Sequence, residues 1–187
     1  MLNEIVEKRR AYRSLSPVEI TLEDIRELAE VSKLAPSCFN KQPWRFVFVR
    51  DPEVLEALFK TLSRGNEWAT RASMVIGVFS SPELDCKVGK REYYLFDTGM
   101  ATAFLILKAT EMGLVAHPIA GYDEEAAKRV LGIPSDMTLI TLIIVGKHSS
   151  EVWEGLSERQ KKDEAKRPER LPLERFSFID QCPKECR

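Results

Sequence analysis

The segment from Asp97 to Gly113 is apolar or small along almost its whole length, and only Lys108 and Glu111 interrupt it. It belongs to the longest predicted helix of the chain, which spans about residues 90–112. A helix with so little polar surface must be covered on nearly every side. Either it is a central core helix within one chain, or a second subunit covers it. The charged residues in this stretch argue against a membrane span.

The length and the charge of the chain set broad limits. With 187 residues it can bury one proper core, so we expect a single domain. A formal net charge of −1 gives no general attraction to nucleic acid or to anionic lipid. The first residues include charged groups and form no apolar leader. We therefore expect no signal peptide, no membrane association, no nucleic-acid partner and a cytoplasmic location.

The four cysteines stand at positions 38, 86, 182 and 186 and form no Cys-x-x-Cys pair, and the chain has only two histidines. This pattern predicts neither a metal site nor a disulfide framework, and it suits a reducing compartment. Cys182 and Cys186 are expected to be ordinary thiols of a polar tail.

Helical and extended segments alternate along the chain. Helices are predicted over about residues 3–10, 21–35, 52–63, 90–112 and 123–132, and strands over about 45–50, 73–79 and 138–145, with a short extended piece within 113–121. This alternation predicts a mixed α/β layered domain around one sheet, and it leaves strand order and direction open. Residues 157–170 are mostly charged, so we expect an extended arm or irregular tail there.

Three arginines, Arg9, Arg10 and Arg13, lie within five residues. Positions 9 and 13 are one helical turn apart, and past a helix end all three side chains could still converge on one anion. Guanidinium groups suit phosphate because their fork geometry gives paired, charge-assisted hydrogen bonds. The cluster therefore indicates either a phosphate site or a solvated basic face.

The loop between Pro36 and Trp44 is rich in small and polar residues. Ser37, Asn40 and Gln42 supply both hydrogen-bond donors and acceptors, which a planar heterocycle requires, and the Pro-Trp pair adds an apolar wall. The alternative is a connecting loop with ordinary turn chemistry. No dinucleotide fingerprint, P-loop or nucleophile elbow occurs in the chain. His117 has no acid–base partner nearby in sequence, and we interpret it as structural. Because no nucleophile or base is then evident, the sequence points to a cofactor that carries the chemistry.

These segments resemble the FMN-dependent nitroreductase family. Residues 9–13 (RRAYR) resemble its amino-terminal Arg-Arg-Ser-x-Arg motif, with alanine at the usual serine position. Residues 35–46 (APSCFNKQPWRF) resemble the second motif and are the most specific match. Further similarity lies in residues 97–102, 113–121, 131–134 and 170–174.

The resemblance implies an α+β fold in which helices flank a mixed, mainly antiparallel sheet, and an intertwined homodimer. Residues 1–150 would form the FMN-binding domain, and residues 151–187 would be a carboxyl-terminal arm that packs on the dimer partner. Each FMN would lie at the subunit interface and contact both chains. This arrangement would also explain the apolar helix.

The resemblance also implies the residues that contact FMN. The amino-terminal arginines and the arm would hold its phosphate, and the second motif, contributed in part by the partner, would line its ring together with the segment after Pro118. The implied residues are Arg9, Arg10, Ala11, Arg13, Pro36, Ser37, Asn40, Gln42, Asn66, Pro118, Ile119, Ala120, Gly121, Arg167 and Arg170.

The implied activity is transfer of hydride from NAD(P)H through flavin N5 to a small acceptor such as a nitroaromatic or a quinone, in a ping-pong cycle. No side chain would act as a catalytic acid or base, and no metal would take part. Two alternatives remain open: another flavin reaction on the same fold, namely reductive dehalogenation or flavin fragmentation, and a non-enzymatic module that binds nucleic acid through the arginine cluster.

Overall fold

The β-branched segment near the end of the chain, β7 (Thr138–His148), is the central strand of the sheet. The protein is described by a computed structural model that covers residues 1–183. On one side β7 pairs with β3 (Met74–Ser80), which pairs in turn with the edge strand β2 (Arg45–Val49). β7 also pairs with β6 (Val115–Ile119) and, through its last residues, with β1 (Leu15–Ser16). Every one of these pairings is antiparallel, which agrees with the expected α+β class.

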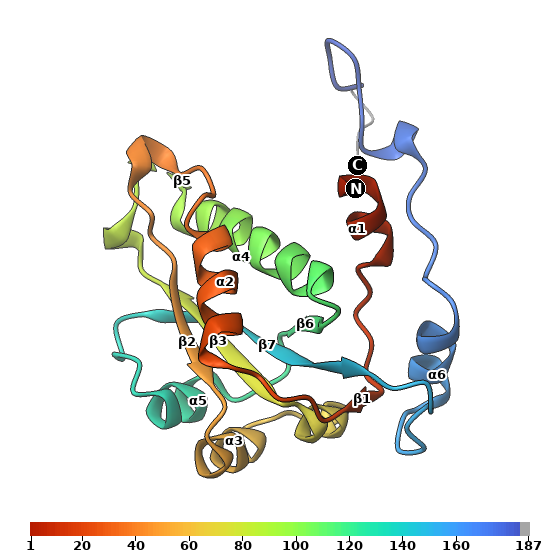
Figure 1. Ribbon diagram of the computed structural model, residues 1–187. Coiled ribbons are helices and arrows are strands. Elements are labelled where there is room, and N and C mark those ends of the chain that lie inside the picture. The colour runs from red at the N-terminus through yellow and green to blue at the C-terminus, as the bar shows by residue number, and fades with distance from the viewer. Residues whose placement is uncertain (184–187) are drawn as a thin grey trace.

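Helices cover both faces of this sheet (Figure 1). Because side chains alternate along a strand, neighbouring residues of β3 and β7 enter different halves of the core. One half packs under α2 (Leu22–Ser32) and α4 (Tyr94–Glu111), and the other packs against α3 (Pro52–Phe59) and α5 (Glu124–Leu131). The β3 and β7 residues of the first half are Met74, Ile76, Val78, Ile143 and Val145, and those of the second are Val75, Leu139, Leu142 and Ile144.

Local sequence signals set the ends of these helices. α2 begins with a capping box, in which the Thr21 hydroxyl accepts from Asp24 N–H and the Asp24 carboxylate accepts from Thr21 N–H. Asp51 caps α3 and Asp123 caps α5 through their carboxylates. α5 ends at Gly132, whose φ of 67° favours glycine.

The remaining elements are short. α1 (Leu2–Lys8) precedes the sheet, and a small hairpin of β4 (Lys87–Val88) and β5 (Arg91–Glu92) precedes α4. Single 3₁₀ turns span Cys38–Asn40, Glu67–Arg71, Pro82–Leu84 and Leu173–Arg175. The predicted helices and strands are confirmed in type and approximate position, whereas β1 and the hairpin were not predicted.

The long helix α4 is a core helix on one side only. Ala101, Leu105 and Ala109 are fully buried against α2 and the sheet. On the remaining surface Phe96 is 63% and Phe104 36% exposed. The described residues therefore cover these two side chains only in part. No helix among residues 1–183 combines the length and the apolar character needed to cross a bilayer.

The expectation of an irregular tail over residues 157–170 is wrong for its first half, which forms α6 (Glu158–Ala165). Ser157 and Gln160 form a capping box at its start, a signal that the charged composition obscured. Near its end Glu164, only 6% exposed, accepts hydrogen bonds from the backbone N–H groups of Arg13 and Ser14. The helix therefore packs on its own chain.

Beyond α6 the chain becomes an arm, residues 168–183, which runs past α1 and projects beyond the body of the molecule (Figure 1). Its apolar side chains have few neighbours within the chain. Leu171, Leu173, Phe176 and Ile179 are all at least 59% exposed. Cys186, the second thiol of the tail pair, lies outside the described residues.

We predict that Glu164→Ala lowers the free energy of unfolding by about 2–3 kcal/mol, because two backbone N–H groups in and beside the buried Ser14 lose their acceptor. Denaturant unfolding measures this loss, and hydrogen exchange at residues 13 and 14 should become faster. Glu158→Ala on the exposed side of α6 is the control and should cost less than about 0.5 kcal/mol. Equal effects of the two variants would contradict the role of Glu164.

Candidate functional site

Five arginines from the two ends of the chain line one small pocket of about 190 Å³. Arg9, Arg10 and Arg13 come from the segment between α1 and β1, and Arg167 and Arg170 come from the segment after α6. The remaining lining residues are Ala11, Asp163 and Pro168. We call this hollow the arginine pocket. It brings together residues that are far apart in the sequence, as the family resemblance implied.

Three of the five guanidiniums are held by contacts within the chain. Arg10 donates to the carbonyl oxygens of Asp163 and Glu164 at 2.7 and 3.2 Å and lies over the Tyr12 ring. Arg13 pairs loosely with Asp163, at 3.9 Å. Arg167 donates to the carbonyl oxygen of Arg9 at 2.7 Å. These contacts fix the walls of the pocket.

The other two guanidiniums have no such partner. No described residue accepts a hydrogen bond from, or forms an ion pair with, the side chain of Arg9 or of Arg170. Burial lowers the pKa of Arg9, and the nearby charges of Arg167, Arg170 and Arg10 lower it further. A single lining carboxylate, Asp163, does not balance this charge. The charge of the pocket therefore favours an anion.

The size of the pocket limits what it can take. Sites that hold a whole cofactor measure roughly 300–1,000 Å³. A hollow of about 190 Å³ suits only the charged end of a nucleotide, and bidentate guanidinium groups fit phosphate oxygens best. FMN meets both conditions if its ring lies outside the pocket.

The expected ring-binding loop, residues 36–44, has a constrained backbone. Phe39, Asn40 and Gln42 all have φ between 47° and 56°, a region that residues other than glycine rarely adopt. The Ser37 hydroxyl accepts from Gln42 N–H at 3.0 Å, and the Asp97 carboxylate accepts from Cys38 N–H at 2.6 Å. Such left-handed residues cost free energy and cluster at binding sites, so they support a functional role for this loop.

Within one chain, however, this loop does not meet the arginine pocket. The contact between Cys38 and Asp97 places the loop at the beginning of α4, whereas α1, which leads into the arginines, packs along α4. Figure 1 shows the orange loop beside β5 and the arginine segment on the opposite side of the molecule, next to α6. Pro36, Ser37, Asn40 and Gln42 thus lie apart from the arginine pocket, and we call them the candidate second half-site.

Residues 118–121, at the end of β6, are joined to Asn66. The Asn66 amide donates to the Gly121 carbonyl oxygen at 2.9 Å, and Ser63 N–H donates to the same oxygen. A Cβ on Gly121 would lie 2.4 Å from the Asn66 amide nitrogen, so a side chain there would break this contact. Pro118 and Ala120 are exposed, whereas Ile119 is buried. Asn66 and Gly121, each expected from the resemblance to contact the flavin ring, thus contact each other.

His117 connects this segment to the arginine motif. Its Nδ1 lies 3.1 Å from the Tyr12 carbonyl oxygen, which only accepts, so Nδ1 carries the hydrogen. Its ring stacks on Trp68 with centroids 4.5 Å apart. Burial lowers the pKa of His117 to about 4, so the ring is neutral near pH 7. This environment fits the structural role expected from the sequence.

Sequence reasoning missed several residues that shape the site. Asp163 and Pro168 line the arginine pocket, and Tyr12 carries Arg10 on one face of its ring and His148 on the other. Asp163 lies in the last turn of α6 and Arg167 lies just beyond the end of that helix, so helical spacing gives no signal for their meeting. Lys166 is not among the lining residues.

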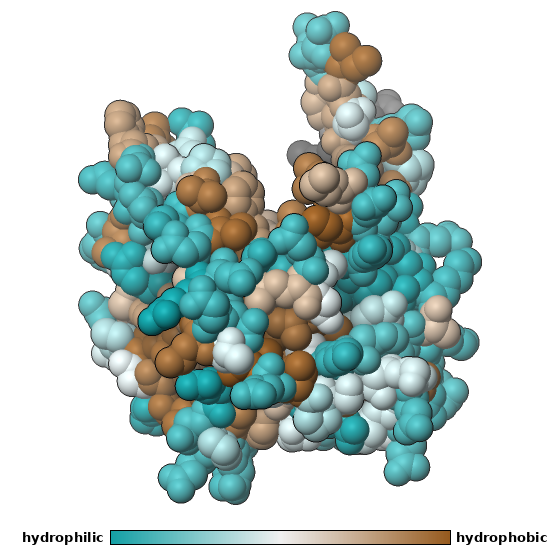
Figure 2. Space-filling model, in the orientation of Figure 1, coloured by the Kyte–Doolittle hydropathy of each residue, from teal (hydrophilic) through white to brown (hydrophobic). Residues whose placement is uncertain are grey.

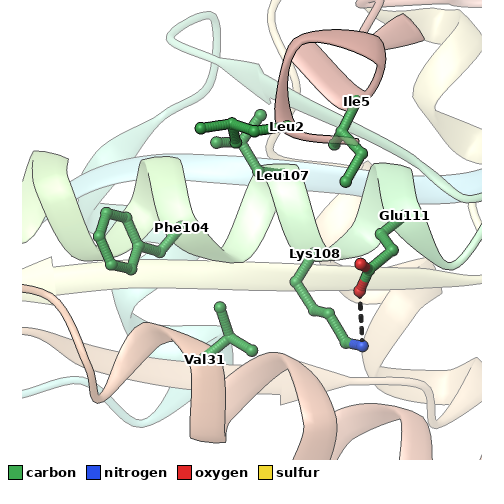
Figure 3. A pocket seen from close by; sticks show the side chains of 7 residues that line it. All are labelled: Leu2, Ile5, Val31, Phe104, Leu107, Lys108 and Glu111. Carbon is green, nitrogen blue, oxygen red and sulfur yellow. Dashed lines mark hydrogen bonds and ion pairs between the residues drawn. The ribbon is translucent and has the colours of Figure 1, made fainter.

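An apolar groove of about 480 Å³ lies beside α4. Leu2 and Ile5 of α1 face Phe104 and Leu107 of α4 across it, and Val31 of α2 closes a third side (Figure 3). The Lys108 ammonium, at one end, is paired with Glu27 and Glu111 at 2.9 Å. In the space-filling view, apolar surface flanks the notch between the α4 side and the column formed by α1 and the arm (Figure 2).

We predict that His117 makes stability depend on pH. Because its pKa is lower in the folded than in the unfolded state, the unfolded chain binds more protons between pH 6.5 and 4. The stability linked to the neutral His117 ring is fully present above pH 6.5. As the pH falls to about 4, the free energy of unfolding decreases by up to about 3 kcal/mol. The free energy of unfolding, measured with denaturant at several pH values in this range, should depend less steeply on pH in His117→Phe than in the wild type. An unchanged slope would contradict burial of a neutral ring.

Comparison with known proteins identifies the family of this chain. A model of the Nitroreductase family matches residues 6–74 and 63–147. A protein of Archaeoglobus fulgidus named as an NADH dehydrogenase/NAD(P)H nitroreductase is 30% identical over 154 residues, 79% of this chain and 86% of that protein.

Two solved structures show the same fold. An oxidoreductase containing FMN has a TM-score of 0.82 at 24% identity, over 95% of this chain and 90% of the other. A nitroreductase from Exiguobacterium sibiricum in complex with FMN has a TM-score of 0.77 at 23% identity, over 96% and 97% of the two chains. Since the family match spans most of the chain and includes the arginine motif, the loop at 36–44 and the end of β6, this protein belongs to the nitroreductase family.

Proposed function

We propose that this protein is a homodimeric FMN-dependent oxidoreductase that uses NADH or NADPH to reduce a small acceptor. The observation that carries the proposal is the arginine pocket, in which both ends of the chain supply positive charge and only one carboxylate opposes it. Membership of the nitroreductase family supports the cofactor and the reductant. When bound, FMN would supply the chemistry, since its N5 position takes up hydride and passes electrons to an acceptor such as a nitroaromatic or a quinone.

The chain's own residues bind and orient the cofactor. Arg9 and Arg170, which lack protein partners, would bind the FMN phosphate, while Arg10, Arg13 and Arg167 hold the pocket open. Pro118, Ala120 and Gly121 would lie along the ring, with Ile119 buried behind them. Asn66, held by the Gly121 carbonyl oxygen, would present its remaining amide atoms to the ring edge. The positive field would also favour the added negative charge of a reduced flavin.

The second half-site would come from the partner subunit. The loop with Pro36, Ser37, Asn40 and Gln42 lies away from the arginine pocket of its own chain (Figure 1). A two-fold axis beside α4 would bring this loop to the pocket of the other chain, because an isologous interface presents the same surfaces on both subunits. The uncovered side of α4 and the groove beside it supply the apolar surface for this contact.

The arm fits the same arrangement. Its apolar residues between Leu171 and Ile179 are exposed and project beyond the body of the chain (Figures 1 and 2). Such a segment is stabilised if it packs on a second copy. We propose that residues 151–167 belong to the body of this chain and that the following arm packs on the partner.

We predict that Arg170→Ala raises the dissociation constant for FMN by about 10–150-fold, which corresponds to losing about 1.5–3 kcal/mol of charge-assisted hydrogen bonding. Riboflavin lacks the phosphate and should bind more weakly than FMN. Its dissociation constant should be the same for the wild type and for Arg170→Ala. Fluorescence titration of both flavins measures this discrimination. Arg129→Ala, an exposed arginine on α5, is the matched control and should leave both constants unchanged. An equal loss for FMN and riboflavin would contradict phosphate binding in the pocket.

We also predict that the purified protein shows the visible absorption of bound flavin and loses it when NADH or NADPH is added without oxygen. An acceptor such as a quinone should then restore the absorption. Flavin that stays oxidised with both nicotinamides, yet reacts after chemical reduction, would contradict this activity and favour another flavin reaction.

We predict that Phe104→Glu dissociates the dimer, because it places a charge in the apolar groove without disturbing a buried side chain. Light scattering after size exclusion should give about half the wild-type mass, and FMN should bind more weakly because the second half-site is lost. Lys60→Glu on α3, at the other face of the sheet, is the control and should remain dimeric. A monomeric wild-type protein that binds FMN fully would contradict the shared site.

A further inference from the structure

Two cysteines that are far apart in the sequence meet two carboxylates at the beginning of α4. Cys38 lies in the 3₁₀ turn of the loop, Asp85 and Cys86 precede the β4–β5 hairpin, and Asp97 lies in the first turn of α4. The ligand atoms of Cys38, Asp85 and Cys86 all lie within 4.8 Å of one another. We call these four residues the thiol–carboxylate cluster. It is separate from the arginine pocket, and the flavin chemistry makes no use of its thiols.

The two carboxylates of the cluster lack a counter-charge. Asp97 is 1% exposed, and among the described residues neither Asp85 nor Asp97 forms an ion pair. One carboxylate oxygen of Asp97 accepts from Cys38 N–H. Asp85 Oδ1 accepts from Cys86 N–H at 2.7 Å, whereas its Oδ2 is buried and has no hydrogen-bond partner. A buried, unpartnered carboxylate oxygen is costly unless a proton or a cation occupies the site.

Burial and the neighbouring groups of the cluster also shift the pKa values of Asp85 and Cys38. Burial raises the pKa of Asp85, and the neighbouring Asp97 carboxylate raises it further. The pKa of Cys38 is raised to about 11, first by its hydrogen bond with Cys86 and then by burial and the nearby carboxylates. Thiols bind metal only after deprotonation, so a bound cation would displace the protons of the two cysteines.

From the position of these ligand atoms we propose that Cys38, Asp85 and Cys86 bind a divalent cation of the zinc class. Thiolates and carboxylates together select a borderline cation such as Zn²⁺ over Mg²⁺ or Ca²⁺, which bind oxygen alone. Two sulfurs on one tetrahedral zinc are about 3.8 Å apart, as Zn–S bonds of about 2.3 Å require. Closing from 4.8 Å or less therefore needs a shift of about 1 Å at most.

A cation bound to this cluster would displace thiol protons and would link the loop at residues 36–44 to its neighbours. Zn²⁺ binding releases the two thiol protons to solvent and involves no electron transfer. A water would complete the tetrahedron, since only Cys38, Asp85 and Cys86 place ligand atoms within 4.8 Å of one another. The cation would link the loop at 36–44, with its left-handed residues, to the hairpin and to α4. The site would thus stabilise a strained loop, whether or not flavin binds there.

A disulfide between Cys38 and Cys86 is the competing use of the thiols. It requires the sulfurs to approach to about 2.05 Å and an oxidant to accept two electrons. Cys38 and Cys86 are both free thiols in this structure, so its geometry favours the cation.

The test is metal binding to the full chain under reducing conditions. The protein is stripped with a chelator and titrated with Co²⁺ and with Zn²⁺ against a competing indicator. We expect one cation per chain, and a Co²⁺ complex with the intense near-ultraviolet absorption of thiolate ligands. Cys86→Ser should weaken Zn²⁺ binding by more than about 100-fold, since losing a ligand costs more than losing an outer partner. Cys182→Ser, the same substitution in the arm, should bind as wild type.

Asp85→Asn is a second test in case Cys86→Ser does not fold. The amide keeps the size of the carboxylate and is a weaker ligand. It should also lose Zn²⁺ affinity, and Zn²⁺ should raise the melting temperature of the wild type more than that of this variant. Wild-type Zn²⁺ affinity in Cys86→Ser and Asp85→Asn would overturn the proposal. So would the absence of thiolate absorption, an equal loss in Cys182→Ser, or a Cys38–Cys86 disulfide in freshly purified protein.

Discussion

Mutual repulsion among the arginines at the two ends of the chain is the constraint on which the rest of the site depends. Arg9 lies close enough to Arg167 and Arg170 for their charges to lower its pKa, and one carboxylate lines the same pocket. Like charges at this distance persist only if the fold holds them or if an anion neutralises them. The fold meets the first condition, because the backbone carbonyls of residues 9, 163 and 164 hold Arg10 and Arg167. The proposed FMN phosphate would meet the second at Arg9 and Arg170.

The fold brings these charges together through a few buried contacts. Glu164 ties α6 to the backbone at residues 13 and 14, and His117 ties β6 to Tyr12. The end of α6, the arginine segment and the edge strand β6 thus form one rigid corner of the sheet. The loop at residues 36–44 is fixed at a different place, by Asp97 at the beginning of α4. A single chain therefore holds two half-sites, and the proposed dimer unites them.

Much of the fold could be predicted from local patterns. The capping box at Thr21 and the β-branched run of β7 act within a few residues, so the sequence indicates them directly. The short strand β1 could not be predicted, because two residues carry no periodicity and are extended only by pairing with β7. The helix α6 was missed because its charged residues show no apolar stripe, although its capping box was visible.

The site could be predicted only in part. The arginines and the second motif were found through family resemblance, and their roles toward FMN stay predictions. The cysteine spacing indicated no metal site, because Cys38 and Cys86 meet only when the loop, the hairpin and α4 have packed. Pairs that tertiary contacts create, such as Asn66 with Gly121, have no signal in one sequence.

The most direct test of the central claim is a crystal structure of the protein grown with FMN. We expect the FMN phosphate within hydrogen-bond distance of Arg9 and Arg170 of one chain, and its ring against the loop at residues 36–44 of the other chain. A phosphate bound elsewhere, with these two guanidiniums directed into solvent, would contradict the account.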